Sequence, residues 1–388
     1  MGARARKSVL ELPVKMVLTD TGTTFFIKNN RRLSKFRMID KAEEYGLQVD
    51  SFSAVSLPRM ILSDYVTRLE TTPGELALAR QGILDMSKLV MYSILYRQFN
   101  AYIMQRILAS EAVRSWNRKN PLNCIDERTG ANLQALGGFA ASHGKDIGEL
   151  KNVILAPILA FITRNSSLLP EEKNVQILLC EKFLDTLNPF IWFVLAKFRS
   201  GDGFDQLVKE LRTSLASYMD KAKIAEYLAL NVMELASNAE NNNLRREAQI
   251  AFKGTIDTNA ILFDRHARDQ VFESLRRKGD LVSIAWKIGS KGASIGTNGK
   301  LAITIFNRES EYGKRKEAFE DGKNADLKKR TLHDFYLSLP EGESSTDLGL
   351  YYLSYLSEAC DKVNIKFEAL VNQISGSDLT VVTLAVNI

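Results

Sequence analysis

A carboxylate and an amide lie four residues apart in the segment "NVMELASNAENNNLRREA", at residues 231–248. Glu234 and Asn238 share one face if this segment is a helix, because residues i and i+4 are about one turn apart. Leu228 and Leu235 belong to an apolar stripe that is expected to pack against a sheet. A carboxylate can act as a general base, and an amide oxygen is a suitable ligand for Mg²⁺. The alternative is a polar pair at the solvent edge of an amphipathic helix.

The elements around this pair predict an α+β sandwich, a sheet with helices on one face. Apolar periodicity predicts helices at 204–219, 221–250 and about 264–277, and again over "LGLYYLSYLSEACDKV". Runs of β-branched residues predict two strand pairs, "DLVSIAWKIGS" with "GKLAITIFN" and "IKFEALVNQ" with "DLTVVTLAVNI". The first pair is joined by a turn that contains Asn298-Gly299, a dipeptide typical of hairpins.

This order of elements and motifs resembles the GHKL (Bergerat) ATP-binding domain shared by gyrase, histidine kinases and bacterial anti-sigma kinases. The resemblance covers roughly residues 204–388 and implies a sandwich of the histidine kinase-like ATPase type, with ATP and Mg²⁺ as cofactors. "ELASNA" is similar to the N box of that family. It implies that Asn238 is the Mg²⁺ ligand and Glu234 the catalytic base. A Glu at position 234, where histidine kinases usually have Asn, favours the gyrase or anti-sigma side.

Two further segments resemble nucleotide-binding motifs of the same family. "TDLGL" is similar to the second glycine box, so Thr346, Gly349 and Leu350 are expected to bind phosphate through free N–H groups at a helix start. In family members a Thr on the last strand lies near the adenine. Thr380 and Thr383 are both candidates for that position, and the sequence does not choose between them.

Other positions depart from the family pattern. The first glycine box should read Asp-x-Gly-x-Gly, with the Asp accepting the adenine amino group, but the chain has Asn307 there and no glycine until Gly313. Asn can accept a hydrogen bond but carries no charge. Asp347 replaces the first glycine of the second box, which places a negative charge near the expected phosphates. The stretch between the boxes is rich in Lys and Arg, which is also typical of a solvated loop.

These motifs predict a cytoplasmic signalling or regulatory protein, either an ATPase or an anti-sigma-type protein kinase that uses Mg-ATP. The alternative is a degenerate pseudo-kinase, in which the domain has become a protein–protein interaction module without nucleotide turnover. Of the three histidines, His143 precedes the ATP-like domain, but "HGKD" lacks the acid that follows a phospho-acceptor. His266 and His333 lie in charged segments and are expected to have no special role.

The first 200 residues are predicted to form a mainly helical sensory or dimerisation domain, and residues 201–388 the GHKL-like domain. "KMVLTD" and "TTFFIK" around Thr21-Gly22 indicate one small β-hairpin, followed by helices from about residue 57. Pro170 and Pro189 indicate helix starts at 170–186 and 189–198. "RSGDGFDQL" at 199–207 breaks the helical pattern and indicates the boundary. A homodimer through the helical half is expected by analogy with the family.

Composition narrows the class of protein. The 388 residues are 45% hydrophobic and 25% charged, which is typical of globular chains long enough for two domains. A net charge of +6 spread along the chain fits nucleotides or an acidic partner and is too weak to indicate nucleic acid, whereas a protein partner in signalling is expected from the family resemblance. Three scattered cysteines indicate no disulfide framework, and no apolar run is long enough for a membrane span, so we expect a cytoplasmic protein.

Overall fold

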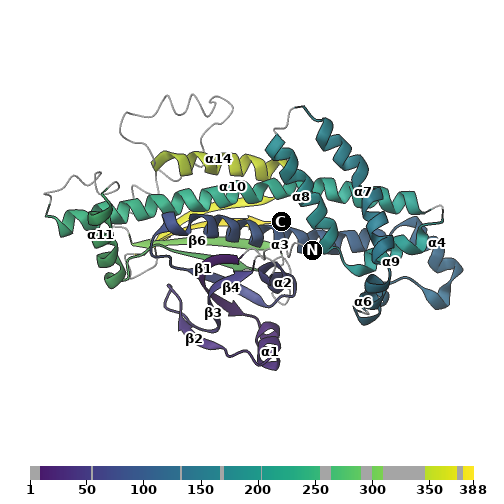
Figure 1. Ribbon diagram of the computed structural model, residues 1–388, viewed down its shortest axis with the longest axis horizontal. Helices are drawn as coiled ribbons and strands as arrows, with labels where there is room; N and C mark the ends of the chain where they lie inside the picture. Colours follow the sequence, from purple (N-terminus) through teal and green to yellow (C-terminus); the bar gives the residue numbers. More distant parts are fainter. Residues whose placement is uncertain are drawn as a thin grey trace, which may run out of the picture. The chain divides into compact units, whose positions relative to one another are not determined.

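The computed structural model describes residues 9–53, 56–131, 133–166, 170–201, 203–253, 264–289, 299–308, 346–373 and 379–388. These residues form an antiparallel sheet of eight strands and a set of helices, so the predicted α+β class is confirmed (Figure 1). The charged stretch 309–345 and the Asn298 position of the predicted turn lie outside the described residues, as does His333.

The sheet joins strands from both ends of the chain. Its strands are β1 (Val9–Leu18), β2 (Ser34–Arg37), β3 (Glu43–Ser53), β4 (Val66–Thr71), β5 (Ser283–Ile288), β6 (Lys300–Arg308), β7 (Lys366–Gln373) and β8 (Leu379–Asn387). Their order is β2-β3-β1-β4-β5-β6-β8-β7, and each neighbouring pair is antiparallel. The pairing of β4 with β5 sets Leu69 opposite Trp286, so the N-terminal strands extend the sheet formed by the C-terminal ones.

The helices follow the predicted pattern closely in the second half of the chain. They are α1 (Asp20–Lys28), α2 (Ser56–Leu62), α3 (Leu76–Leu108), α4 (Glu111–Lys119), the 3-10 turn η1 (Pro121–Asn123), α5 (Glu127–Ala131), α6 (Leu133–Ser142), α7 (Gly144–Arg164), α8 (Pro170–Thr186), α9 (Pro189–Phe198), α10 (Phe204–Ala251), α11 (Arg265–Lys278) and α14 (Thr346–Lys362). Both prolines expected at helix starts, Pro170 and Pro189, occupy the first helical position, where a missing N–H costs nothing.

The division into compact units differs from the predicted boundary at residue 200. One unit comprises Met1–Ile94 with Ile224–Ile388, and the other comprises Leu95–Lys223. The physical reason is the sheet: hydrogen bonding between β4 and β5 puts the N-terminal strands and the C-terminal strands into one unit. The predicted breaker at 199–207 precedes α10, but α10 continues from the second unit into the first. A separate N-terminal domain of residues 1–200 is therefore not present.

The predicted small hairpin at the start of the chain is wrong. Asp20–Lys28 is helix α1, and four strands rather than one hairpin lie in the first 71 residues. Thr19 caps this helix by accepting a hydrogen bond from the Gly22 N–H at 2.9 Å. Gly22 is required by close packing and not by a turn, because a Cβ at this position would lie 2.2 Å from the Tyr65 carbonyl oxygen.

The two helices predicted at 204–219 and 221–250 form one continuous helix, α10. Neither Gly nor Pro separates them, and the junction residues Asp220 and Lys223 form an i,i+3 ion pair at 3.7 Å on the helix surface. Because the helix is unbroken, Glu234 and Asn238 lie well inside it and not near an end.

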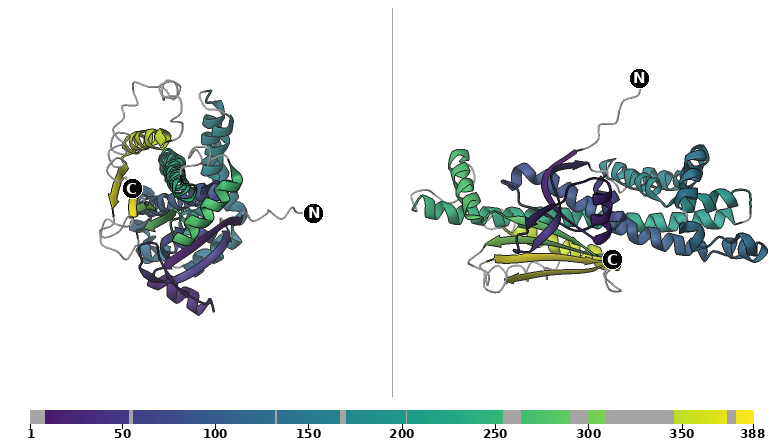
Figure 2. Two further views of the ribbon diagram at one scale, coloured as in Figure 1. Left: turned by 90° about the vertical axis from the view of Figure 1, so that its left-hand side faces the viewer. Right: turned by 90° about the horizontal axis from the view of Figure 1, so that it is seen from below.

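Three long helices contact the same face of the sheet. Trp286 of β5 donates a hydrogen bond to Ser87 of α3 at 3.1 Å, and Trp286 pairs with Ile303 of β6. Asn307 of β6, four residues beyond Ile303, therefore lies on the same face, since side chains alternate along a strand. It contacts Asn243 of α10. Helices α10 and α14 run side by side over this face (Figures 1 and 2).

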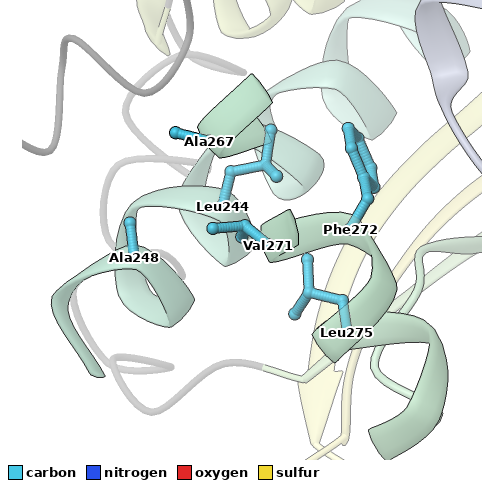
Figure 3. Packing of buried hydrophobic residues seen from close by; sticks show 6 residues of the cluster. All are labelled: Leu244, Ala248, Ala267, Val271, Phe272 and Leu275. Carbon is cyan, nitrogen blue, oxygen red and sulfur yellow. The ribbon is translucent and has the colours of Figure 1, made fainter. Parts of the chain in front are cut away.

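Helix α11 packs on the C-terminal part of α10. Leu244 and Ala248 of α10 contact four residues of α11 in a buried cluster (Figure 3), namely Ala267, Val271, Phe272 and Leu275. Asp264 caps the start of α11, and Gly279, at φ 72°, ends it in the left-handed conformation that glycine adopts without strain. This packing places Asp280, which follows the cap, beside α10.

The unit of residues 95–223 is helical and has its own aromatic core. Phe183 and Tyr218 lie 4.6 Å apart between ring centroids, and Tyr96 and Phe99 contact Phe183 edge-on. Burial raises the pKa of Cys180 in this core to about 11, so its thiol is not a nucleophile near neutral pH. His143 is exposed at the start of α7 and stacks on Phe139.

Candidate nucleotide site

Glu234 and Asn238 differ in how far α10 buries them. Asn238 is 5% exposed and lies within the packed part of the unit. The Glu234 side chain is 21% exposed, and its Oε1 atom lies 3.3 Å from Nη2 of Arg80 in α3. One oxygen of the carboxylate is thus held by a cation from a neighbouring helix.

Helix α14 runs antiparallel to α10 beside this pair. The Asn231 amide donates to the Tyr352 carbonyl oxygen at 3.1 Å, and further along α14 Lys362 interacts electrostatically with Tyr227. Residues later in α14 therefore lie beside residues earlier in α10, so the two helices run antiparallel. The first turn of α14, which precedes Tyr352, therefore lies alongside the part of α10 that follows Asn231.

The predicted residues of the second glycine box lie in this first turn. Thr346, Gly349 and Leu350 belong to the backbone of α14, but their side chains lie outside the described residues.

Strand register distinguishes the two candidate threonines. Thr380 of β8 pairs directly with Asn307 of β6, so their side chains lie on one face, with Cβ atoms roughly 4.5–5.5 Å apart. Thr383 pairs with Thr304. It faces the opposite side of the sheet, because it lies three positions beyond Thr380 and side chains alternate along a strand. The burial pattern agrees: Thr380 is 1% exposed and belongs to the buried face of β8. Thr380 joins Asn307, and Thr383 does not.

Asn243 of α10 determines the orientation of the Asn307 amide. Its Nδ2 atom donates to the Asp280 carbonyl oxygen at 3.0 Å, and a carbonyl can only accept, so the identity of this nitrogen is settled. The same nitrogen lies 2.6 Å from the Asn307 side chain, which must therefore present its Oδ1 atom. Asn307 Nδ2 consequently points away from Asn243. Asn243 thus uses one lone pair of the acceptor predicted at Asn307, the second lone pair remains, and the amide N–H of Asn307 is unpaired.

Three buried polar atoms at this end of the sheet have no hydrogen-bond partner among the residues that the structure describes. They are Nδ2 of Asn307, Oγ1 of Thr380 and Oδ1 of Asn243. Leaving a buried polar atom unsatisfied costs about 1–3 kcal/mol, so each of them calls for a partner such as a ligand or an ordered water. A purine edge offers ring nitrogens and an exocyclic group that can pair with such atoms, although neither Asn307 nor Thr380 lines the cavities of about 550 and 310 Å³.

The described residues offer few ligands for Mg²⁺, and proteins usually supply only one or two. No group of three or more His, Cys, Asp or Glu side chains suited to a metal occurs among the described residues. Mg²⁺ characteristically takes one or two protein ligands and completes its shell with phosphate oxygens and water. Asn238 could provide its amide oxygen in this way.

The sequence reasoning missed the two amides that organise the site. Asn231 hydrogen-bonds α10 to α14, and Asn243 orients the amide of Asn307. A signal was present in the sequence, because both are polar residues within the apolar stripe of α10, where an unpaired amide is costly. Both are less than 3% exposed.

Two cavities lie away from these residues. A cavity of about 550 Å³ is bordered by the β1 segment, the start of α3 and one face of α11, with Pro73, Asp269 and Arg276 in its wall. Another of about 310 Å³, within residues 95–223, is lined by Phe139, His143 and Lys197 among others. None of the residues predicted from the sequence to bind nucleotide or metal lines either cavity.

Comparison with known proteins places the chain in one family. The model of a family of unknown function, DUF8084, matches residues 5–388. The chain belongs to this family. An uncharacterized protein of Treponema pallidum (strain Nichols) is 37% identical over 386 residues, which cover 99% of both chains, so similarity to this relative extends over both compact units. No solved structure matches the chain. Within the described residues, no helix combines the length and apolarity needed to span a bilayer.

Proposed function

We propose that residues 224–388 form a nucleotide-binding domain of the GHKL type, which holds a purine nucleoside triphosphate with Mg²⁺ and serves a signalling or regulatory role. The observation that carries the proposal is the pairing of Asn307 with Thr380 under α10. These residues, expected from the family to lie at the base, occupy adjacent strands, and both retain an unsatisfied buried polar atom.

The arrangement of the helices supports the same proposal. The first turn of α14 lies alongside the part of α10 that follows Asn231, and free N–H groups at this helix start would bind phosphate oxygens. Asn238 would hold Mg²⁺, which neutralises the triphosphate charge. Glu234, once released from Arg80, would act as the base toward water or a protein hydroxyl.

A second candidate function is an interaction module that binds nucleotide without turnover, or not at all. The ion pair between Glu234 and Arg80 favours it, because the proposed base already has a partner in α3. Phosphate release measured with Mg-ATP and Mg-GTP separates the two candidates. Turnover that disappears in Glu234→Gln while nucleotide binding persists supports the enzyme. Absence of turnover in the unaltered chain, with binding intact, supports the module.

Titration with fluorescent ribose-labelled ATP and GTP in the presence of Mg²⁺ tests the binding itself. We expect saturation below millimolar nucleotide and a marked loss of affinity in Asn238→Ala or after addition of EDTA. Gln249→Ala, at an exposed amide further along α10, is the matched control and should bind as the unaltered chain does. If neither analogue saturates at millimolar concentration while the protein is folded, the proposed function is wrong.

A further inference from the structure

The cavity of about 550 Å³ between β1, the start of α3 and α11 has a volume typical of small-molecule sites. Its inner wall is apolar, because Leu12, Pro73 and Phe272 line it and are buried. Leu78 and Ala79 of α3 continue this apolar wall toward solvent, and Leu78 is 85% exposed. An alkyl chain placed against this wall would be removed from water together with an exposed leucine, which is favourable.

The charged residues around this cavity are mostly acidic. Four carboxylates and one guanidinium line it, namely Glu11, Glu75, Asp269, Glu273 and Arg276. Glu75 pairs with Arg268 at 3.0 Å, and Glu273 pairs with Arg276 at 3.0 Å, so two of the carboxylates are neutralised within the fold. Glu11 and Asp269 are exposed and form no ion pair with any residue that the structure describes. The cavity is therefore negative, although the chain as a whole carries a net charge of +6.

Helical spacing places Asp269 on the face of α11 that borders the cavity. Asp269, Phe272, Glu273 and Arg276 all line it, and positions i, i+3, i+4 and i+7 share one face of a helix. Arg276 reaches the segment before α3, because a Cβ on Gly74 would lie 2.9 Å from its Nη2 atom. Asp269 thus lies about one turn from the buried ring of Phe272, so an unpaired charge adjoins an apolar surface.

Neither a metal ion nor an anion suits this lining. Ca²⁺ and Mg²⁺ require several oxygen ligands, and no group of three or more His, Cys, Asp or Glu side chains suited to a metal occurs among the described residues. The carboxylates repel an anionic ligand such as a nucleotide. An organic cation with an apolar part can use both the charge and the apolar wall.

We propose that this cavity binds an aliphatic diamine or polyamine. One ammonium group pairs with Asp269 and a second with Glu11, while the carbon chain between them lies against Leu78 and Ala79. Two carboxylates without a partner favour a ligand with at least two positive charges. The proposal does not depend on the proposed function, because none of the residues assigned to nucleotide lines this cavity.

Isothermal titration calorimetry of the full chain with cadaverine and spermidine tests the proposal. We expect saturation at millimolar concentration and weaker binding in high salt, which screens exposed charges. Pentane-1,5-diol has the carbon chain of cadaverine without its charges, and glutarate has a chain of the same length with two negative charges. Neither should bind.

Variants locate the binding. Glu11→Gln and Asp269→Asn, at two exposed positions, should each weaken cadaverine roughly two- to fivefold, as the loss of one exposed ion pair does. Ala79→Phe fills the cavity and should abolish binding. Asp361→Asn, at an exposed carboxylate of α14 that does not line the cavity, is the matched control and should bind as the unaltered chain does.

Binding of both amines that is weakened in Glu11→Gln and Asp269→Asn but not in Asp361→Asn supports the proposal. Absence of binding by both amines at millimolar concentration overturns it, and so does binding of the diol as tight as that of cadaverine. Amine binding that is unchanged in both charge variants also overturns it, because the amines then bind elsewhere. Circular dichroism checks the fold of Ala79→Phe; if this variant is unfolded, the two charge variants still decide.

Discussion

Glu240 is buried at the start of α3, where its Oε1 atom accepts a hydrogen bond from the Leu76 backbone N–H at 2.8 Å. Its other oxygen lies 3.6 Å from Arg268, which also pairs with Glu75. Burial outweighs these favourable contacts and raises the pKa of Glu240 from 4.5 to about 7. One carboxyl group of α10 therefore both caps a neighbouring helix and titrates near neutral pH.

This raised pKa predicts a stability that falls as pH increases. Between about pH 4.5 and 7 the folded chain holds a proton on Glu240 that the unfolded chain has released, so the free energy of unfolding decreases across that window. The change is at most on the order of 3 kcal/mol. Glu240→Gln resembles the protonated state and should remove this part of the pH dependence.

Urea denaturation at pH 5, 6, 7 and 8 measures the effect. The advantage of the unaltered chain over Glu240→Gln should shrink as pH rises. Glu273→Gln, at a half-exposed glutamate of α11, is the control and should keep the original slope. Parallel pH profiles for the unaltered chain and Glu240→Gln would show that Glu240 ionises normally.

At the scale of elements, two glycines have opposite roles although both lie inside regular structure. Gly46 in β3 faces β1, and a Cβ there would lie 1.9 Å from the Met16 carbonyl oxygen. Gly137 lies inside α6, where a Cβ would meet no atom within 4 Å. The glycine of the strand is therefore needed for close pairing, whereas that of the helix only increases the entropy of the unfolded chain.

The two glycines predict substitutions of opposite sign. Gly46→Ala should lower the free energy of unfolding by about 1–3 kcal/mol, because β1 and β3 must separate or shift. Gly137→Ala should raise the stability of its unit by about 0.5–1 kcal/mol. Thermal melts followed by circular dichroism compare the two variants with the unaltered chain. Equal effects of the two substitutions would contradict this account of Gly46.

At the scale of the whole molecule, the unit of residues 95–223 interrupts the chain of the other unit. The two points of interruption are close, because Tyr92 of α3 donates to Glu226 of α10 at 2.9 Å, and Lys88 pairs with the same carboxylate. A short connection can therefore join Ile94 to Ile224 without strain, since closing a short loop between neighbouring helices costs little entropy.

Two truncations test this organisation. Replacement of residues 95–223 by a short Gly/Ser linker should give a folded, monodisperse protein that keeps the sheet and its nucleotide affinity. Residues 201–388 alone should aggregate, because β5 loses β4 and exposes an unpaired edge. Size-exclusion chromatography and circular dichroism distinguish these results. A well-folded 201–388 fragment together with an unfolded linker variant would reverse the assignment of units.

Local patterns in the sequence were sufficient to predict many of the helices and strands. Pro170 and Pro189 indicated two helix starts, and the alternation in "LTVVTLAVN" predicted β8, because helix caps and side-chain periodicity depend on near neighbours. The candidate site residues could also be proposed from their motifs, and the sequence alone led to Glu234, Asn238, Asn307 and Thr380.

Only the tertiary structure decided how these parts combine. The partner of β4 is β5, more than 200 residues away, and no local pattern specifies such a pairing. Gly22 indicated a turn in the sequence, because the true reason for it, the approach of Tyr65, comes from a distant segment. Register separated Thr380 from Thr383, and Asn243, 64 residues before Asn307, fixed the orientation of the Asn307 amide. Composition and periodicity depend on residues that are neighbours along the chain, and they determine helices and strands. Strand order and amide orientation depend on contacts that exist only after folding.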